Sequence, residues 1–470
     1  MQVPAHIFRE YDVRGLVDPD LRPGTVEALG RAVATYVAGH SGDARPALSV
    51  GRDVRPSSDR LHADLARGIT SAGADVVDIG VVPTPVQYFS LHRLAVDGGV
   101  MVTGSHNPPE YNGFKISLGK APLMGSEIQE LRSIIERDAF RAGPGEETRQ
   151  PVTSDYLTAV RERVQLARPL KVVVDPANAT GALFATKLLE QIGCQVVAIN
   201  DWVDGTFPAH HPDPTVDEHL EEMIACVRSE GAAAGFGFDG DCDRLGAVDD
   251  TGRVVRGDQL TAILARDQLA QTPGAKILFD VKSSRALVED IRAHGGQPVM
   301  WKTGHSLAKR KMWEDGIPFG GEMSGHLFFN YNYYGFDDAI YAACLLARVL
   351  SRSSRSFSEL LSELADYPST PELRLETTEE RKWSVVEAAK RHFAGRGETN
   401  EVDGVRVDLP EGWFLLRTSN TQPVVVLRIE GRDRAALESL QAEVGEFLRG
   451  QGMGPLPWEM PSAASGRAHG

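Results

Sequence analysis

Residues 171–199 read KVVVDPANATGALFATKLLEQIGCQVVAI, and this stretch contains one complete structural unit. The apolar run at 171–175 ends at an aspartate and predicts a buried strand. A helix is expected near 181–192, and Gly193 stands where that helix has to end. A second apolar run at 195–199 predicts a second strand. The stretch therefore predicts a β-α-β unit.

The same pattern occurs in two other places. Residues 47–79 contain a strand, a helix, Gly73 and a second strand, and residues 276–301 repeat that order around Gly295-Gly296. These copies are a domain's length apart, too far for a solenoid repeat. We predict three related α/β domains with mixed or parallel sheets. The first strand of each copy ends at an aspartate: Asp53, Asp175 and Asp280.

The sequence changes character after about residue 365. Strand and helix patterns with one polar loop predict a small α+β domain, and the Pro-, Ser- and Gly-rich end is expected to fray. The expected fold is thus three related α/β domains with mixed sheets and a C-terminal α+β domain around one central cleft. We expect the domains at 1–150, 151–252, 253–366 and 367–455, followed by a flexible tail at 456–470.

Bulk properties limit the classes of function. The chain has 470 residues, of which 42% are hydrophobic and 24% charged, as in ordinary soluble proteins. Its formal net charge of -15 argues against binding to nucleic acids or anionic membranes. No apolar run is long enough to span a bilayer, and no signal peptide is visible. Four scattered cysteines form no CxxC pair and are expected to be free thiols. We therefore expect a cytoplasmic protein.

Each β-α-β copy is followed by one polar loop, and three such loops can meet in one cleft. After the first copy, residues 103–115 read TGSHNPPEYNGFK and follow an apolar run at 98–102. Ser105 is thus presented beyond the carboxyl end of a strand, where ligands bind in open α/β sheets. His106 is its neighbour, and Lys115 lies at the far end of the loop. A simple surface turn capped by Ser105 fits this stretch alone equally well.

The loop after the second copy is acidic and reads DGDCDR at residues 239–244. Asp239, Asp241 and Asp243 would repel one another unless a cation lay among them, and their oxygen atoms suit Mg²⁺ or Ca²⁺. An EF-hand calcium loop is disfavoured, because its sixth position requires glycine and is Arg244 here. We favour Mg²⁺, with Arg244 beside it to meet a phosphate. A solvated acidic turn is the alternative.

Further loops carry groups that suit a phosphorylated sugar. The loop GEMSGH, residues 321–326, offers a carboxylate, a hydroxyl and an imidazole for sugar hydroxyls: Glu322, Ser324 and His326. The loop KTGHS, residues 302–306, adds the titratable His305 beyond a predicted strand. The loop RTSNTQP, residues 417–423, has donors that suit a dianionic phosphate: Arg417, Ser419, Asn420 and Thr421. Arg14, in a charged turn, is a candidate anion contact.

Together these five motifs resemble, in the same order, those of the α-D-phosphohexomutase family. The resemblance covers nearly the whole chain, from FREYDVRG at residues 8–15 to the C-terminal domain. One departure is Cys242, where relatives often have glycine. This residue lies between the candidate ligands and is not expected to remove one, but it could alter the flexibility of the loop.

The resemblance implies a role for each candidate residue. Ser105 is expected to be a phosphoserine that donates and recovers a phosphoryl group, and one of its phosphoryl oxygens is expected to complete the Mg²⁺ site of the three aspartates. Lys115 and His305 are the expected acid/base groups, with Arg244 close to the phosphoserine. The expected substrate contacts are Arg14, His106, Lys282, Glu322, Ser324, His326, Arg417, Ser419, Asn420 and Thr421.

The implied reaction moves a phosphoryl group reversibly between C1 and C6 of mannose and glucose phosphates through a 1,6-bisphosphate. Hexose phosphates are the expected substrates, glucose 1,6-bisphosphate the activator, and a monomer or weak homodimer the expected state. A phosphoglucosamine mutase is the nearest alternative, although Met323 replaces the glutamine that such members tend to carry. A metal-dependent phosphatase is another alternative, but it would need no second phosphate-binding loop, so the loop at Arg417 counts against it. A non-catalytic Ca²⁺-binding protein is disfavoured because the EF-hand glycine is absent.

Overall fold

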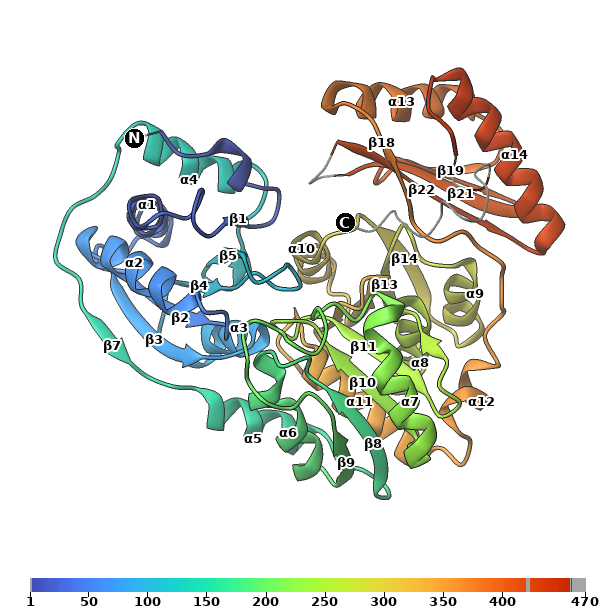
Figure 1. Cartoon of the computed structure of the whole chain (residues 1–470), viewed down its shortest axis with the longest axis horizontal. Coiled ribbons are helices and arrows are strands. Elements are labelled where there is room, and N and C mark those ends of the chain that lie inside the picture. Colours follow the sequence, from blue (N-terminus) through green and yellow to red (C-terminus); the bar gives the residue numbers. More distant parts are fainter. Residues whose placement is uncertain (1, 420–422, 457, 459–470) are drawn as a thin grey trace.

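The computed structural model describes residues 2–419, 423–456 and 458, which form four sheets flanked by helices (Figure 1). Three α/β units follow one another along the chain. The fourth unit, built on an antiparallel sheet, is at the upper right of Figure 1. The predicted fold class, three related α/β units and a C-terminal α+β unit, is confirmed.

The first sheet has seven strands in the order β1-β5-β4-β2-β3-β7, with β6 paired to β5. The central strand β2 is parallel to β3 and β4, and β5 is antiparallel to β4. The strands are β1 (Val13–Leu16), β2 (Ala47–Arg52), β3 (Asp75–Val81), β4 (Gly98–Val102), β5 (Tyr111–Leu118), β6 (Ala121–Pro122) and β7 (Glu147–Arg149). The helices are α1 (Pro23–Ser41), α2 (Ser58–Ser71), α3 (Thr84–Arg93) and α4 (Ser126–Glu136).

The second sheet has the order β12-β11-β10-β8-β9. Its strands are β8 (Leu170–Asp175), β9 (Cys194–Ala198), β10 (Ala234–Phe238), β11 (Leu245–Asp249) and β12 (Val254–Val255). Its helical segments are α5 (Thr153–Arg163), η2 (Thr180–Leu183), α6 (Ala185–Gln191), η3 (Asp217–Leu220) and α7 (Glu221–Glu230). The single helix expected near 181–192 is therefore a 3-10 turn and a short α-helix, separated at Phe184.

The third sheet has the order β14-β13-β15-β16-β17. Its strands are β13 (Lys276–Asp280), β14 (Gln297–Trp301), β15 (Phe319–Gly321), β16 (Leu327–Phe329) and β17 (Phe336–Asp337). Its helices are α8 (Gly257–Gln271), α9 (Arg285–Ala293), α10 (His305–Asp315), α11 (Ala339–Arg352) and α12 (Phe357–Leu361). α9 begins where the Ser284 side chain accepts a hydrogen bond from the Ala286 amide, a normal N-cap.

The three α/β units repeat one pairing pattern, as the sequence copies predict. In each unit the first strand of the β-α-β copy (β2, β8 or β13) lies between two strands that are parallel to it. One of these is the second strand of the copy. The other (β4, β10 or β15) pairs on its far side with an antiparallel strand. The strands β4, β10 and β15 are therefore equivalent. Because each is parallel to its central strand, their carboxyl ends project loops from equivalent edges of the three sheets.

One hydrophobic core joins the second and third units and includes α3 of the first. The start of α11 is its polar anchor. The buried Asp338 caps this helix by accepting from the Tyr341 amide, and it also accepts hydrogen bonds from the hydroxyls of Tyr156 and Tyr333. The next amide, that of Ala339, donates to the Cys242 carbonyl. The core thus holds the acidic loop through its backbone.

The fourth sheet has the order β18-β22-β21-β20-β19 and is antiparallel throughout. Two helices pack on one face, and on the other face Trp413 and Leu415 contact Val281 of the third unit. The elements are β18 (Leu373–Glu376), α13 (Glu379–His392), β19 (Glu398–Asn400), β20 (Val405–Leu409), β21 (Gly412–Thr418), β22 (Val424–Gly431) and α14 (Arg434–Gly450).

The prediction of a flexible tail from residue 456 is wrong for the part of that segment that the structure describes, Leu456 and Trp458. Leu456 is fully buried in the core of the fourth unit, and Trp458 packs against the same core. Apolar side chains in a Pro-rich end can bury area wherever a helix such as α14 leaves a surface for them. Within the described ranges, no helix is long and apolar enough to cross a membrane.

The helices α1 and α2 approach each other unusually closely at two glycines. A Cβ atom at Gly30 would lie 2.3 Å from the Leu65 carbonyl oxygen, and one at Gly68 would lie 2.1 Å from the Glu27 carbonyl oxygen. Both distances are too short for any side chain. Glycine is therefore required at this crossing, where the helix backbones are in contact.

Gly68→Ala should lower the free energy of unfolding by about 1–3 kcal/mol, because the added methyl group must push the two helices apart. Urea denaturation followed by circular dichroism measures this change. The matched control is Gly39→Ala in α1, where an added Cβ meets no atom within 4 Å. That substitution should stabilise the helix by up to about 1 kcal/mol. Equal effects of the two substitutions would show that the helices are not in backbone contact.

Candidate active site

Ser105 lies on the loop after β4, against the acidic loop after β10. Its hydroxyl donates to the Asp239 Oδ2 atom at 2.9 Å, and the residue is only 2% exposed. The two loops also touch through their backbones, because a Cβ at Gly240 would lie 2.3 Å from the Ser105 carbonyl oxygen. The sequence-predicted pairing of the serine loop with the acidic loop is therefore present as a direct contact.

The acidic loop brings three carboxylates together in the protein interior. Asp239, Asp241 and Asp243 are each at most 1% exposed, and each offers an oxygen within 4.8 Å of the other two. Burial, with the charges of Asp243 and Asp241, raises the pKa of Asp239 well above its usual range. Cys242, between two of the acids, has a left-handed backbone with φ 60° that turns the chain.

A cation fits this arrangement. The Oδ1 atoms of Asp241 and Asp243 are buried and accept no hydrogen bond from the described residues, although His326 Nε2 lies 3.4 Å from Asp243 Oδ1. Buried carboxylate oxygens without partners are costly, and a divalent cation would satisfy them. The candidate ligands are the three carboxylates and the Ser105 hydroxyl. All of them offer oxygen atoms, which suit a hard ion such as Mg²⁺.

Lys115 on β5 compensates part of this negative charge. Its Nζ atom donates to Asp241 Oδ2 at 2.6 Å and also to Asp243 Oδ2. Burial alone would lower the pKa of Lys115, but the charges of Asp241 and Asp243 raise it well above its usual range. The lysine is therefore a protonated group held within the acidic cluster.

The loop after β15, residues 321–326, contacts the acidic loop through His326. Its Nδ1 atom lies 3.1 Å from Glu322 Oε2, and its Nε2 atom lies 3.4 Å from Asp243 Oδ1. The Ser324 hydroxyl bridges Glu322 and His326: it lies 3.0 Å from Glu322 Oε2 and 2.8 Å from His326 Nδ1. Against the effect of burial, Asp243 and Glu322 raise the pKa of His326 to about 9.

His305, at the start of α10, is stacked on His326 with 5.4 Å between ring centroids. Burial and the nearby charge of Lys309 lower the pKa of His305 well below its usual range. Lys309 Nζ lies 3.2 Å from His305 Nδ1 and also donates to Asp337 at 2.8 Å. Since an ammonium group can only donate, Nδ1 accepts and the ring carries its proton on Nε2.

The remaining candidates surround this cluster. Arg14 Nη1 donates to Asn107 Oδ1 on the serine loop at 3.0 Å. His106 Nδ1 lies 2.8 Å from Asp213 Oδ2, and burial with the charge of Arg244 lowers the pKa of His106 to about 4. The backbone amide of Arg244 donates to Asp239 Oδ1 at 3.2 Å. These candidates therefore adjoin the serine and acidic loops.

Three described candidates on the side of the fourth unit make their contacts away from the acidic cluster. Lys282 Nζ lies 3.1 Å from Glu372 Oε2. Arg417 Nε lies 3.0 Å from Asp403 Oδ2, and the same carboxylate accepts a hydrogen bond from the Thr303 amide. The Ser419 carbonyl accepts from Lys382 at 2.8 Å. Asn420 and Thr421 lie outside the described residues.

Sequence reasoning missed several residues that hold this site. Thr84 donates its hydroxyl to Asp241, Asp213 pairs with His106, and Lys309 sets the tautomer of His305. Arg55 donates to the backbone of the serine loop. Only Arg55 had a signal in the sequence, because it lies two residues after the strand-end Asp53.

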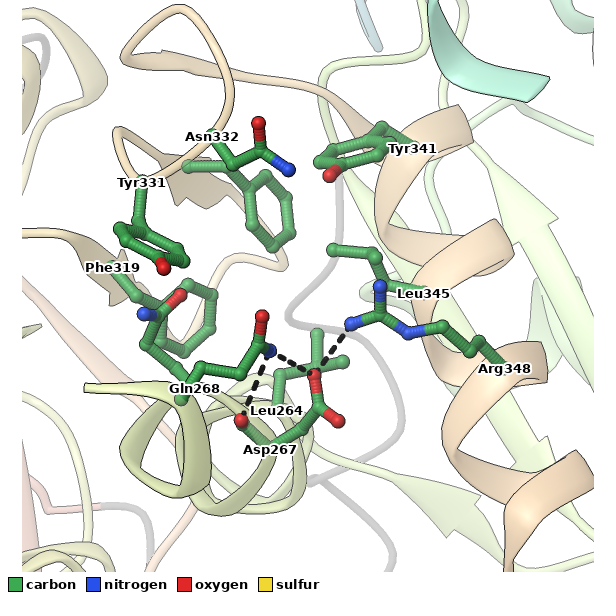
Figure 2. A pocket seen from close by; sticks show the side chains of 11 residues that line it. Leu264, Asp267, Gln268, Phe319, Tyr331, Asn332, Tyr341, Leu345 and Arg348 are labelled. Atoms are coloured by element: carbon green, nitrogen blue, oxygen red, sulfur yellow. Dashed lines mark hydrogen bonds and ion pairs between the residues drawn. The ribbon is translucent and has the colours of Figure 1, made fainter. Parts of the chain in front are cut away.

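Figure 2 shows a separate pocket between α8, α11 and the segment around Tyr331. Arg348 of α11 pairs there with Asp267 of α8 at 2.5 Å, and the aromatic rings of Phe319 and Tyr341 line the same pocket. None of the predicted site residues that the structure describes lines this pocket. The Ser105 site and this pocket are therefore distinct features.

Comparisons with known proteins agree with this geometry. Four family models match in order: "Phosphoglucomutase/phosphomannomutase, alpha/beta/alpha domain I" at residues 5–142, domain II at 154–252, domain III at 256–367, and the C-terminal domain at 372–446. The matched segments cover most of the chain and include each of the loops described above.

Individual relatives match over nearly their full length. A phosphomannomutase/phosphoglucomutase of Pseudomonas aeruginosa is 43% identical over 440 residues, 93% of this chain and 94% of that protein. A phosphoglucomutase of Neisseria meningitidis is 42% identical over 93% of this chain and 95% of its own length. A solved phosphoglucomutase/phosphomannomutase family protein of Burkholderia thailandensis has a TM-score of 0.91 at 40% identity, covering 96% of this chain and 98% of that one. The chain belongs to the phosphoglucomutase/phosphomannomutase family.

Proposed function

We propose that the chain catalyses reversible phosphoryl transfer between C1 and C6 of mannose and glucose phosphates. The observation that carries this proposal is the buried contact between the Ser105 hydroxyl and Asp239, within a carboxylate cluster that Lys115 partly neutralises. The names of the relatives support the same class of reaction. Glucose 1,6-bisphosphate is the proposed activator.

Ser105 Oγ carries the transferable phosphoryl group in this scheme. A sugar hydroxyl attacks phosphorus, so that the bond from phosphorus to Ser105 Oγ breaks while a bond to the sugar oxygen forms. Lys115 returns a proton to Ser105 Oγ, and its raised pKa fits a group that is protonated before the step. The proton released by the sugar hydroxyl restores the ammonium form of Lys115 after Lys115 has protonated the leaving Ser105 Oγ. The 1,6-bisphosphate then turns over, and its other phosphoryl group returns to Ser105.

Electrostatic stabilisation is the main requirement of such a step, because the transferring group spreads negative charge over its oxygens. Asp239, Asp241 and Asp243 would hold Mg²⁺, which supplies charge neutralisation when bound. Arg244, the last residue of the acidic loop, is assigned to the phosphoryl oxygens. His305 remains the second acid/base candidate; with its proton on Nε2 it starts as a hydrogen-bond donor.

The substrate has to bind in two orientations, with either phosphate at Ser105. We assign Glu322, Ser324 and His326 to the sugar hydroxyls, and Arg14, His106 and Lys282 to the phosphate groups between the units. The Arg417 loop, with Ser419, Asn420 and Thr421, is assigned to the phosphate that does not react. The protein is proposed to act in the cytoplasm as a monomer or weak homodimer without nucleic-acid or membrane partners. We also retain the domain boundaries at 150, 252 and 366 as a proposal, whereas the boundary at 455 is withdrawn because Leu456 and Trp458 pack against the core of the fourth unit.

Ser105→Ala should abolish mutase turnover, because no other group can accept the phosphoryl group at that position. The wild-type protein incubated with glucose 1,6-bisphosphate should gain one phosphoryl group on Ser105, which intact-mass analysis and peptide mapping detect. The control is Ser384→Ala on α13, which should behave as wild type. Full activity of Ser105→Ala, or a phosphoryl group on another serine, would reject the mechanism.

Chelation with EDTA should stop turnover, and added Mg²⁺ should restore it. Asp241→Asn removes one ligand charge and should lower kcat by at least about 10²-fold without loss of circular dichroism, since phosphoryl transfer depends on charge stabilisation. Asp18→Asn, at an exposed site, is the control. Undiminished turnover in EDTA would remove the metal from the mechanism.

Sugar selectivity should be weak at the 2-hydroxyl. A site that anchors the ring elsewhere, through Glu322 and Ser324, should give kcat/KM values for mannose 1-phosphate and glucose 1-phosphate within about tenfold, or about 1.4 kcal/mol. Glu322→Ala should depress both together. Glucosamine 1-phosphate should be poorer, because Met323 offers no hydrogen bond to an amino group. A preference for glucosamine 1-phosphate would favour the phosphoglucosamine mutase alternative, and steady release of inorganic phosphate would favour a phosphatase.

A further inference from the structure

The guanidinium group of Arg55 lies in contact with the backbone of the loop that carries Ser105. The residue follows β2 and is only 2% exposed. Four of its hydrogen bonds go to main-chain carbonyl groups of the serine loop. The accepting oxygens and distances are Ser105 (2.6 Å), Asn107 (2.5 Å), Pro108 (2.6 Å) and Tyr111 (3.1 Å).

The fifth N–H group of Arg55 also has a partner. Its Nε atom donates to Asp53 Oδ2 at 3.1 Å. The same carboxylate oxygen accepts from the Thr103 hydroxyl at 2.8 Å and the Gly104 amide at 3.2 Å. The Arg55–Asp53 pair therefore holds the loop from two sides: the arginine binds its carbonyl groups, and the aspartate binds the segment just before Ser105.

The surrounding residues are shaped to admit this guanidinium. A Cβ atom at Gly104 would lie 2.6 Å from both the Cζ and Nε atoms of Arg55, so a side chain there would displace the group. The ring of Phe207, from the second unit, lies 5.0 Å from Arg55 Cζ. Gly104 in the serine motif is thus explained by contact with Arg55, which the sequence alone does not reveal.

The serine loop needs such a support. Ser105 has φ 49°, a left-handed conformation that is unfavourable for a residue with a side chain. Two prolines follow, and they cannot donate backbone hydrogen bonds. Arg55 binds the carbonyl group of Ser105 itself and those of three later residues. The orientation of the Ser105 hydroxyl toward Asp239 therefore depends on backbone contacts made by Arg55.

We propose that Arg55 is a positioning residue for the phosphoryl-transfer step: its five-donor fork fixes the serine loop so that Ser105 Oγ faces the acidic loop. This inference rests on the proposed function. Arg55 does not touch the reacting atoms, so it should affect kcat far more than KM. A misplacement of the reacting oxygen by about 1 Å can lower the rate by about 10²-fold.

Arg55→Lys is the direct test, because lysine keeps the positive charge but cannot reproduce a planar five-donor fork. We expect kcat with glucose 1-phosphate to fall at least about tenfold while KM stays within about threefold. Hydrogen exchange of the backbone amides in residues 104–111 should become faster, with no change in β8. The matched control is Arg52→Lys; the Arg52 side chain pairs with Asp59 and Asp78 and, among the described residues, forms no hydrogen bond or ion pair with the serine loop.

Gly104→Ala provides a second variant if Arg55→Lys does not fold. With Arg55 retained, its methyl group should displace the guanidinium and cause the same selective loss of kcat. In the double variant the losses should be smaller than the product of the two single losses, because both substitutions remove one interaction. Independent, multiplicative losses would contradict the proposal.

The outcomes separate this inference from the proposed function. Wild-type kcat and unchanged exchange at 104–111 in Arg55→Lys would reject the positioning role and leave the mutase assignment intact. If the wild-type protein showed no mutase activity, the proposed function would fail, and the role of Arg55 in the chemistry would fail with it. Hydrogen exchange would then still decide whether Arg55 fixes the loop.

Discussion

The burial of three carboxylates within five residues is the constraint on which the rest of the structure depends. Such a cluster is strongly unfavourable unless other groups compensate its charge, because each buried ion loses its hydration. Here the compensation comes from different parts of the chain: Lys115 from β5 of the first unit and His326 from the loop after β15 of the third. The charge of the acidic loop is therefore compensated by groups from both neighbouring units. Among the described residues, Asp241 Oδ1 still has no hydrogen-bond partner and Asp243 Oδ1 has only the ion pair with His326, which leaves a place for a cation.

This constraint explains the architecture of repeated units. Equivalent strands β4, β10 and β15 end at loops that carry Ser105, the three aspartates and Glu322, and the parallel pairing in each unit directs these loops from equivalent sheet edges. The contact of Asp338 with Tyr156 and the bond from Ala339 to Cys242 then fix the acidic loop from the side of the core. The start of α11 thus both packs in the core and holds the acidic loop, so a substitution there would also shift the positions of the carboxylates.

Local patterns in the sequence were sufficient to predict most of the fold and the loops that meet at the candidate site. Of the three strands that were predicted to end at an aspartate, the one at 276–280 has the predicted bounds. The other two differ by one residue: β2 ends at Arg52, before Asp53, and β8 begins at Leu170. Strand length and burial are local properties, so the pattern predicts them closely. Contacts between distant segments could not be predicted in this way. The pairing of Lys309 with His305 and the bonds from Arg55 to the serine loop depend on tertiary structure. The burial of Leu456 was missed because composition favoured a frayed end, whereas packing against α14 decided the outcome.

The central claim is that Ser105 passes its phosphoryl group to a sugar and not to water. A single-turnover experiment tests it most directly: enzyme carrying radiolabelled phosphate on Ser105 is mixed with unlabelled glucose 1-phosphate, and the products are separated. The account predicts that the label appears in glucose 1,6-bisphosphate and glucose 6-phosphate. Label recovered mainly as inorganic phosphate, or retained on the protein while turnover proceeds, would contradict it.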